Sequence, residues 1–144
     1  MLTIRNAVAV ITGGASGIGL ALARYWAQQG GRVVLGDVAE EALSQAAAEI
    51  QALGGEVATV VGNVTREEDC GRLADAAIQR FGAINLVAPF AGIIADGLLL
   101  ATDRETGKVK SKMPLAQFQK VVDINLTGVF LTVRECAARM VDHG

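Results

Sequence analysis

The sequence predicts an α/β fold of the doubly wound kind, in which helices cover both faces of a parallel sheet. Short apolar runs alternate four times with segments of helical periodicity, each ten or more residues long. That length suits the right-handed crossovers that join parallel strands. A glycine-rich turn also joins the first apolar run to the first helical segment. The 144 residues suffice for one domain and are too few for two independent cores.

The first strand and helix show the pattern most clearly. Residues 7–12 read AVAVIT, an uninterrupted apolar run typical of a strand buried on both faces. Apolar side chains then recur at helical spacing from Gly17 to Gln29, and Gly30–Gly31 can form a left-handed C-terminal cap. The segment therefore predicts a strand, a tight turn and a helix.

The same alternation predicts the remaining elements. Thr65 and Glu68 have the spacing of a capping box and are expected to begin the third helix. Between residues 103 and 112, Thr106–Gly107 indicates the tip of a small hairpin. In chain order we expect a strand over 32–36 that stops at Asp37, a helix over 39–53 closed by Gly54–Gly55, a strand over 56–61, a helix ending near Phe81, a strand over 84–88 and a helix over 114–141 bent near Thr127–Gly128.

Composition narrows the classes of function. A net charge of −2 provides no basic field for a phosphate backbone, so we expect no nucleic-acid partner. No apolar run reaches about 18 residues, and the first ten residues lack the features of a signal peptide, so we expect no membrane partner. Cys70 and Cys136 lie in helical segments and are expected to be buried, reduced thiols, which favours a cytoplasmic location.

A candidate phosphate site lies where the first strand meets the first helix. Residues 12–19 read TGGASGIG, and amides at a helix N-terminus attract anions while glycines let a pyrophosphate approach the backbone. Asp37 ends the second strand 18 positions after Gly19, near the spacing of a carboxylate that accepts hydrogen bonds from a ribose. Asp37 could also cap the following helix. Together these features predict a Rossmann-like dinucleotide site.

The TGGASGIG segment resembles the TGxxxGxG fingerprint of the short-chain dehydrogenase/reductase family, and the similarity covers essentially the whole chain. The resemblance implies that Gly13, Ser16, Gly17, Ile18 and Gly19 hold the pyrophosphate of a nicotinamide cofactor. It also implies that Asp37 binds the adenosine ribose and favours NAD over NADP, because a 2′-phosphate would meet like charge.

Two further turns match the family only in part. Asn63–Val64 stands where the family usually has Asp-Val against the adenine, and asparagine keeps an acceptor oxygen for that contact. As a lone residue, Asn63 is equally consistent with a plain turn. Pro89, Phe90, Ala91 and Gly92 replace the family's Asn-Asn-Ala-Gly. The resemblance implies that the backbone of Ala91–Gly92 passes close to the adenosine ribose. Pro89 lacks a backbone donor that the family residue has, and Phe90 replaces a polar side chain.

The segment around Asn125 is similar to the family's central-helix motif. It reads VDINLTGVF, and in the family this asparagine perturbs the helix and holds a water molecule of the proton relay. The resemblance therefore implies that Asn125 is catalytic, whereas a solvent-facing helical asparagine is the alternative reading. Catalysis in the family also needs a Ser and a YxxxK motif. The only tyrosine, Tyr25, is followed four residues later by Gln29 and lies on the first helix, so it cannot fill that role.

Residues 93–112 are longer than in many members and resemble an insertion in some hydroxyacyl-CoA dehydrogenases of the family. Lys108, Lys110 and Lys112 would share one face of a strand, where they could steer an anionic carrier or simply be solvated. His143 is interpreted as part of a helix end.

These readings predict that residues 1–144 are the dinucleotide-binding part of a longer, homo-oligomeric single-domain enzyme, a dimer or tetramer, with the Ser and YxxxK motif beyond Gly144. The expected reaction is NAD-dependent interconversion of a secondary alcohol and a ketone, which could be a 3-hydroxyacyl and 3-oxoacyl thioester. Two alternatives stay open: a nucleotide-binding module without catalysis, and an NADP-dependent 3-oxoacyl-carrier reductase.

Overall fold

Four parallel strands form the central sheet of the computed structural model, which describes residues 3–143. The strand order is β3-β2-β1-β4, so β1 lies inside the sheet and the chain reverses its direction of winding between β3 and β4. This order confirms the doubly wound α/β class and leaves β4 at one edge. The strands are β1 (Val8–Thr12), β2 (Arg32–Asp37), β3 (Glu56–Val61) and β4 (Leu86–Pro89).

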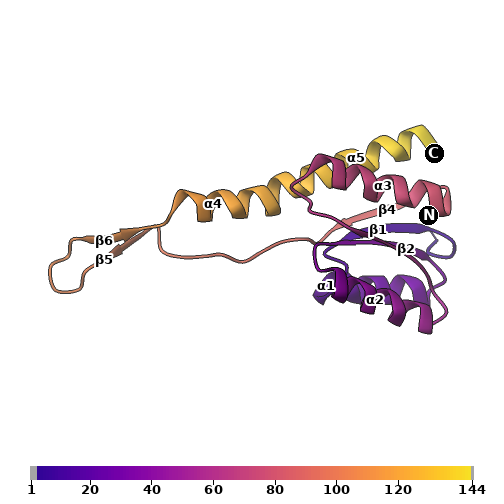
Figure 1. Cartoon of the computed structure of the whole chain (residues 1–144), viewed down its shortest axis with the longest axis horizontal. Helices are drawn as coiled ribbons and strands as arrows, with labels where there is room; N and C mark the ends of the chain where they lie inside the picture. Colours follow the sequence, from indigo (N-terminus) through magenta and orange to yellow (C-terminus); the bar gives the residue numbers. More distant parts are fainter. Residues whose placement is uncertain (1–2, 144) are drawn as a thin grey trace.

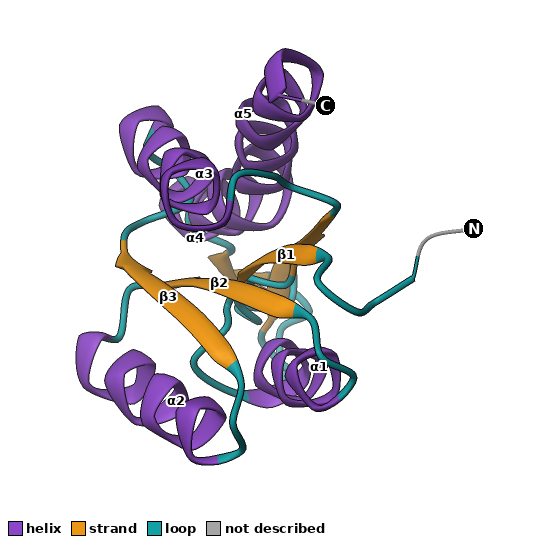
Figure 2. Cartoon of the chain, turned by 90° about the vertical axis from the view of Figure 1, so that its right-hand side faces the viewer, coloured by secondary structure: helices purple, strands orange, loops and turns teal. Residues whose placement is uncertain are grey.

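Helices cover both faces of the sheet (Figure 1, Figure 2). One face carries α1 (Gly17–Gln28) and α2 (Glu40–Ala52), and the other carries α3 (Glu67–Phe81) and α5 (Gly128–His143), which contact each other. Among residues 3–143, no helix is long and apolar enough to cross a membrane.

Alternation along β1 divides the core into two layers. Ala9 and Ile11 pack on the side of α1 and α2, where Trp26 also lies. Val8 and Val10 pack on the opposite side against α3 and α5, next to Cys136. Burying successive side chains on opposite faces explains why this strand reads as a continuous apolar run.

Glycines end the helices as the sequence predicts. Gly30 has φ of +79° and Gly54 has φ of +77°, in the left-handed region that glycine reaches without strain. The capping-box prediction is wrong: α3 begins at Glu67 with Arg66 as its N-cap. The Thr65 hydroxyl donates instead to Asn63 Oδ1, which lies two residues back along the chain.

The fourth strand starts two residues later than predicted because the Asn85 side chain takes the place of a strand partner. Its Oδ1 accepts the backbone N–H of Val8. Pro89 is included in β4 beside Thr12, and an edge strand tolerates its missing N–H.

The long C-terminal helical segment contains a π-helical turn rather than the bend expected at Thr127–Gly128. The turn spans Asp123–Thr127 and separates α4 (Leu115–Val122) from α5, and together they form one rod (Figure 1). The predicted hairpin forms β5 (Leu100–Thr102) and β6 (Val109–Lys112) and projects away from the sheet. Asp103 Oδ1 accepts hydrogen bonds from Thr106 at its tip.

Two helical glycines should respond oppositely to substitution by alanine. An added Cβ at Gly19 would lie against the Gly13 carbonyl, a backbone group that cannot move aside. We expect Gly19→Ala to destabilise the fold by about 2 kcal/mol or more. At Gly71 in α3 the added Cβ would meet only the ends of flexible side chains at 3.7 Å or beyond. Gly71→Ala should therefore stabilise the fold by about 0.5–1 kcal/mol, as measured by urea unfolding. Equal changes in the free energy of unfolding for the two variants would contradict the close contact inferred at Gly19.

Candidate functional site

A groove of about 570 Å³ opens at the carboxyl ends of the parallel strands, where ligands bind in open α/β sheets. Its walls are the turns that follow β1, β2, β3 and β4, together with one side of α4 and the π-helical turn. The eleven residues that the sequence predicts for cofactor binding all line this groove: Gly13, Ser16, Gly17, Ile18, Gly19, Asp37, Asn63, Val64, Phe90, Ala91 and Gly92.

The turn after β1 brings the N-terminus of α1 into the groove. The helix begins at Gly17, and the Leu20 N–H donates to the carbonyl of its N-cap, Ser16. Its first turn carries no acidic side chain, and the N-cap side chain makes no capping hydrogen bond. Gly17 has φ of +53°, and an added Cβ there would have no atom within 4 Å. This geometry fits an anion, because amide hydrogens and open space coincide with the positive end of the helix dipole.

Asp37 ends β2 with its carboxylate at the groove. Oδ2 accepts the N–H of Ala15 at 3.2 Å, and Oδ1 accepts the N–H of Ala39 at 3.1 Å. The alternative that Asp37 is an N-cap is wrong, because α2 begins at Glu40 with Ala39 as its N-cap. An ionised carboxylate has about four acceptor positions, so two hydrogen bonds leave capacity for hydroxyl groups of a ligand.

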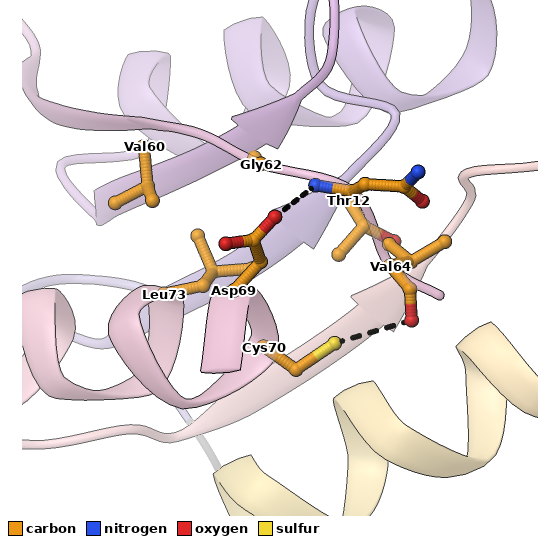
Figure 3. Close-up of a pocket in the computed structure, with 9 residues that line it drawn as sticks. Thr12, Val60, Gly62, Val64, Asp69, Cys70 and Leu73 are labelled. Carbon is orange, nitrogen blue, oxygen red and sulfur yellow. Dashed lines mark hydrogen bonds between the residues drawn. The ribbon is translucent and has the colours of Figure 1, made fainter. Parts of the chain in front are cut away.

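The turn after β3 is held by α3 (Figure 3). Asp69 Oδ2 accepts the N–H of Asn63 at 2.8 Å, and the Cys70 thiol donates to the Val64 carbonyl at 3.4 Å. Two hydrogen bonds lower the pKa of Asp69: the bond from the Arg72 side chain has the larger effect, and the bond from the Asn63 N–H has the smaller. Ionised Asp69 thus fixes the turn that carries Asn63 and Val64.

The turn after β4 is anchored by groups outside it. The N–H of Ala91 donates to Thr12 Oγ1 at 3.3 Å. An added Cβ at Gly13 would lie 2.8 Å from the Ala91 nitrogen, so glycine allows this close approach. Phe90 remains 45% exposed beside the groove.

Asn125 lies in the π-helical turn and clamps the chain that follows β4. Its Oδ1 accepts the N–H of Ile93 and its Nδ2 donates to the carbonyl of Ile93, both at 2.9 Å. Ile93 lines the groove, whereas Asn125 does not. The side chain therefore positions backbone at the site, and π-helical turns are often found at functional sites.

Sequence reasoning missed six groove residues. Four of the six are adjacent in sequence to predicted groove residues, and this adjacency is the signal that could have identified them. Lys120 and Ile124 come from the helix before Asn125, where spacing of four residues places both on one side. The missed residues are Gly36, Val38, Gly62, Ile93, Lys120 and Ile124.

The other singled-out side chains lie elsewhere. Tyr25 is 53% exposed on α1, and His143 is exposed at the end of α5. Cys70 and Cys136 are free and buried, as predicted. Burial raises the pKa of both thiols, that of Cys136 to about 12, so neither is a reactive thiolate near neutral pH.

The family model described as short chain dehydrogenase matches residues 7–144, and the chain belongs to that family. It is 34% identical over 141 residues to 1-deoxy-11-beta-hydroxypentalenate dehydrogenase of Streptomyces exfoliatus, covering 98% of this chain and 48% of that protein. It is 33% identical over 129 residues to the 3-oxoacyl-(acyl-carrier-protein) reductase of Thermotoga maritima, covering 90% and 48%. The chain thus spans about half the length of these curated relatives.

Solved structures agree with the fold. A short-chain dehydrogenase/reductase from Mycobacterium marinum superposes with a TM-score of 0.80 at 31% identity, covering 96% of this chain and 52% of that chain. NAD⁺-bound xylitol dehydrogenase gives 0.79 at 28% identity, covering 98% and 50%.

Asp69 should contribute pH-dependent stability. Asp69→Ala leaves the Asn63 N–H without its acceptor, and we expect a loss of about 1–2 kcal/mol near neutral pH. Folding lowers the pKa of Asp69, so its contribution is complete above the ordinary carboxyl value near 4 and declines as the pH falls through the folded value. Urea unfolding at several pH values measures this, with exposed Asp142→Ala as the control. A pH-independent difference would contradict the assignment.

Asn125→Asp should weaken the clamp on Ile93. An ionised carboxylate cannot donate to the Ile93 carbonyl, and it would place a negative charge 2.9 Å from that oxygen. We expect a loss of about 1–3 kcal/mol in unfolding experiments and faster amide exchange at Ile93. Protonation of the new carboxyl should restore a donor, so the loss should shrink at low pH. Unchanged exchange at Ile93 would rule out the clamp.

Proposed function

We propose that this chain is the dinucleotide-binding part of a longer single-domain oxidoreductase that interconverts a secondary alcohol and a ketone with NAD. Membership of the family and the names of the relatives support an oxidoreductase. The observation that carries the choice of cofactor is one groove that joins the glycine turn at the N-terminus of α1 to the carboxylate of Asp37.

The cofactor's parts are assigned along this groove. The pyrophosphate would lie on the turn from Gly13 to Gly19, contacting Ser16, Gly17 and Ile18. The adenosine ribose would bind Asp37, and the adenine would lie against Asn63 and Val64. Phe90, Ala91 and Gly92 form the opposite wall beside the ribose. When bound, NAD⁺ would supply the hydride acceptor for oxidation of the alcohol carbon, and the hydroxyl proton would pass to a base as the ketone forms.

NAD is favoured over NADP by charge at the ribose end. A 2′-phosphate beside Asp37 would meet an ionised carboxylate, and the neighbouring groove residue is the apolar Val38. Among residues 3–143, Lys120 is the one cationic side chain that lines the groove, and it lies on α4 rather than on the turn after β2.

The rest of the enzyme is assigned by the same proposal. Tyr25 lies on α1 and does not line the groove, so the acid/base tyrosine would be supplied by residues beyond this chain. Asn125 would hold the relay water through its backbone, because both ends of its amide are bonded to Ile93. We propose a cytoplasmic homo-oligomer, a dimer or tetramer, that acts on a small alcohol or ketone and has no nucleic-acid or membrane partner.

An acyl thioester is the more specific substrate that the hairpin supports. Lys110 and Lys112 alternate with Val109 and Ser111 in β6 and so share one face, and all four residues are exposed. Such a face could steer the phosphates of a CoA or a carrier protein. If reversing the charge of the three hairpin lysines leaves KM for a CoA substrate unchanged, the face has no such role.

Asp37→Asn should weaken discrimination between the two cofactors. The wild type should bind NAD more tightly than NADP, and the neutral side chain should reduce that preference about tenfold or more because repulsion of the 2′-phosphate is removed. Calorimetric titration of both cofactors measures the ratio. Asp142→Asn, an exposed change of the same charge far along α5, is the matched control.

Each open alternative has its own outcome. Tighter binding of NADP by the wild type would favour the NADP-dependent 3-oxoacyl-carrier reductase. If the longer protein that contains this chain binds NAD but oxidises no secondary alcohol, as measured by nicotinamide absorbance, a nucleotide-binding module would be favoured. Failure to bind either cofactor would refute the proposed function.

A further inference from the structure

The acceptor oxygen of Asn63 is already saturated within the chain. Oδ1 accepts the backbone N–H of Thr65 at 3.0 Å and the Thr65 hydroxyl at 2.9 Å. An amide oxygen has two lone pairs, and these two donors occupy both. The side-chain oxygen of Asn63 is therefore not free to accept a hydrogen bond from a ligand.

The orientation of this amide is fixed by its partner. A backbone N–H can only donate, so the atom that faces Thr65 N must be the oxygen of Asn63. The Nδ2 group consequently occupies the position of the second carboxylate oxygen that an aspartate would have. Asn63 lines the groove, and within residues 3–143 its Nδ2 has no hydrogen-bond acceptor.

The turn cannot readily rotate to exchange these atoms. Asp69 holds the Asn63 N–H, and the Cys70 thiol holds the Val64 carbonyl. The Val64 side chain packs so closely on α5 that an added Cβ at Gly128 would lie 2.6 Å from its Cγ2. The polarity of the groove at Asn63 is therefore set by the sequence and not by rearrangement on binding.

We propose that Asn63, with its oxygen held by Thr65, makes the purine subsite tolerant of a 6-oxo base in place of adenine. This inference rests on the proposed function, which places the base against Asn63 and Val64. Adenine presents an amino donor at C6, which would face the Nδ2 donor of Asn63. Hypoxanthine presents a carbonyl at C6, whose lone pairs can accept from Nδ2, and it carries an N–H at N1, where adenine has an unprotonated nitrogen.

Aspartate at the same position would have the opposite preference. Its Oδ1 would still accept from Thr65, and its Oδ2 would accept from the adenine amino group while repelling a 6-oxo group. Pairing a donor with a donor leaves polar groups unsatisfied, and a mismatch of this kind changes affinity about tenfold or more. The Thr65 hydroxyl acts through Asn63, because its hydrogen bond helps to keep Oδ1 turned toward Thr65 and Nδ2 at the position that the base would meet.

The test compares binding of NAD and nicotinamide hypoxanthine dinucleotide by calorimetric titration, expressed as the ratio of their dissociation constants. In the wild type we expect the two constants to lie within about threefold of each other. Asn63→Asp should raise the preference for NAD about tenfold or more. Thr65→Val removes the hydroxyl but keeps the backbone N–H that orients the amide of Asn63, so it should leave the ratio of the two constants close to that of the wild type.

Thr59→Val is the matched control, because Thr59 is exposed in the middle of β3 and does not line the groove. It should leave the ratio unchanged. A wild type that binds NAD at least tenfold more tightly than the hypoxanthine analogue, with no change in Asn63→Asp, would overturn this inference alone. A wild type that binds neither dinucleotide would overturn the proposed function together with it.

Discussion

The close approach of α1 to the turn after β1 is the constraint on which the site depends. Gly19 lies so near the Gly13 carbonyl that no Cβ fits between them, and Gly13 in turn leaves room for the backbone of Ala91. These contacts draw the helix N-terminus into the sheet's carboxyl edge. The strand order then brings the ends of β2, β3 and β4 beside it, so one turn of backbone determines where an anion and a sugar could lie together.

Each loop of the groove is fixed by a group from a different element. The turn after β1 donates from Ala15 to Asp37, and the turn after β4 donates from Ala91 to Thr12. The π-helical turn holds Ile93 through Asn125. Such cross-bonding fixes the backbone before a ligand arrives, which lowers the conformational entropy lost on binding. These bonds also hold the turn after β4, where Pro89 and Phe90 stand in place of the family's two asparagines.

The fold was largely predictable because its signals are local and repeated. Apolar runs and capping glycines located the strands and helices, and the residues at the strand ends all reached one groove. The failures involve competition between hydrogen-bond partners. Thr65 has the right spacing for a capping box, yet its hydroxyl binds Asn63, and Asn85 replaces a backbone pair at the start of β4. Periodicity does not encode such choices, nor the approach of Lys120 from α4.

Asp37 and Asn63 form the same side-chain to backbone hydrogen bond but present different hydrogen-bonding groups to the groove. Each ends a strand region with Oδ1 accepting the N–H two residues ahead, from Ala39 in one case and Thr65 in the other. The turn therefore uses one side-chain atom in both places. What remains for a ligand is set by the other atom: a charged acceptor at Asp37, and an amide donor at Asn63. Replacing a carboxylate by its isosteric amide can thus preserve the fold of the turn while reversing the hydrogen-bonding character that the groove presents.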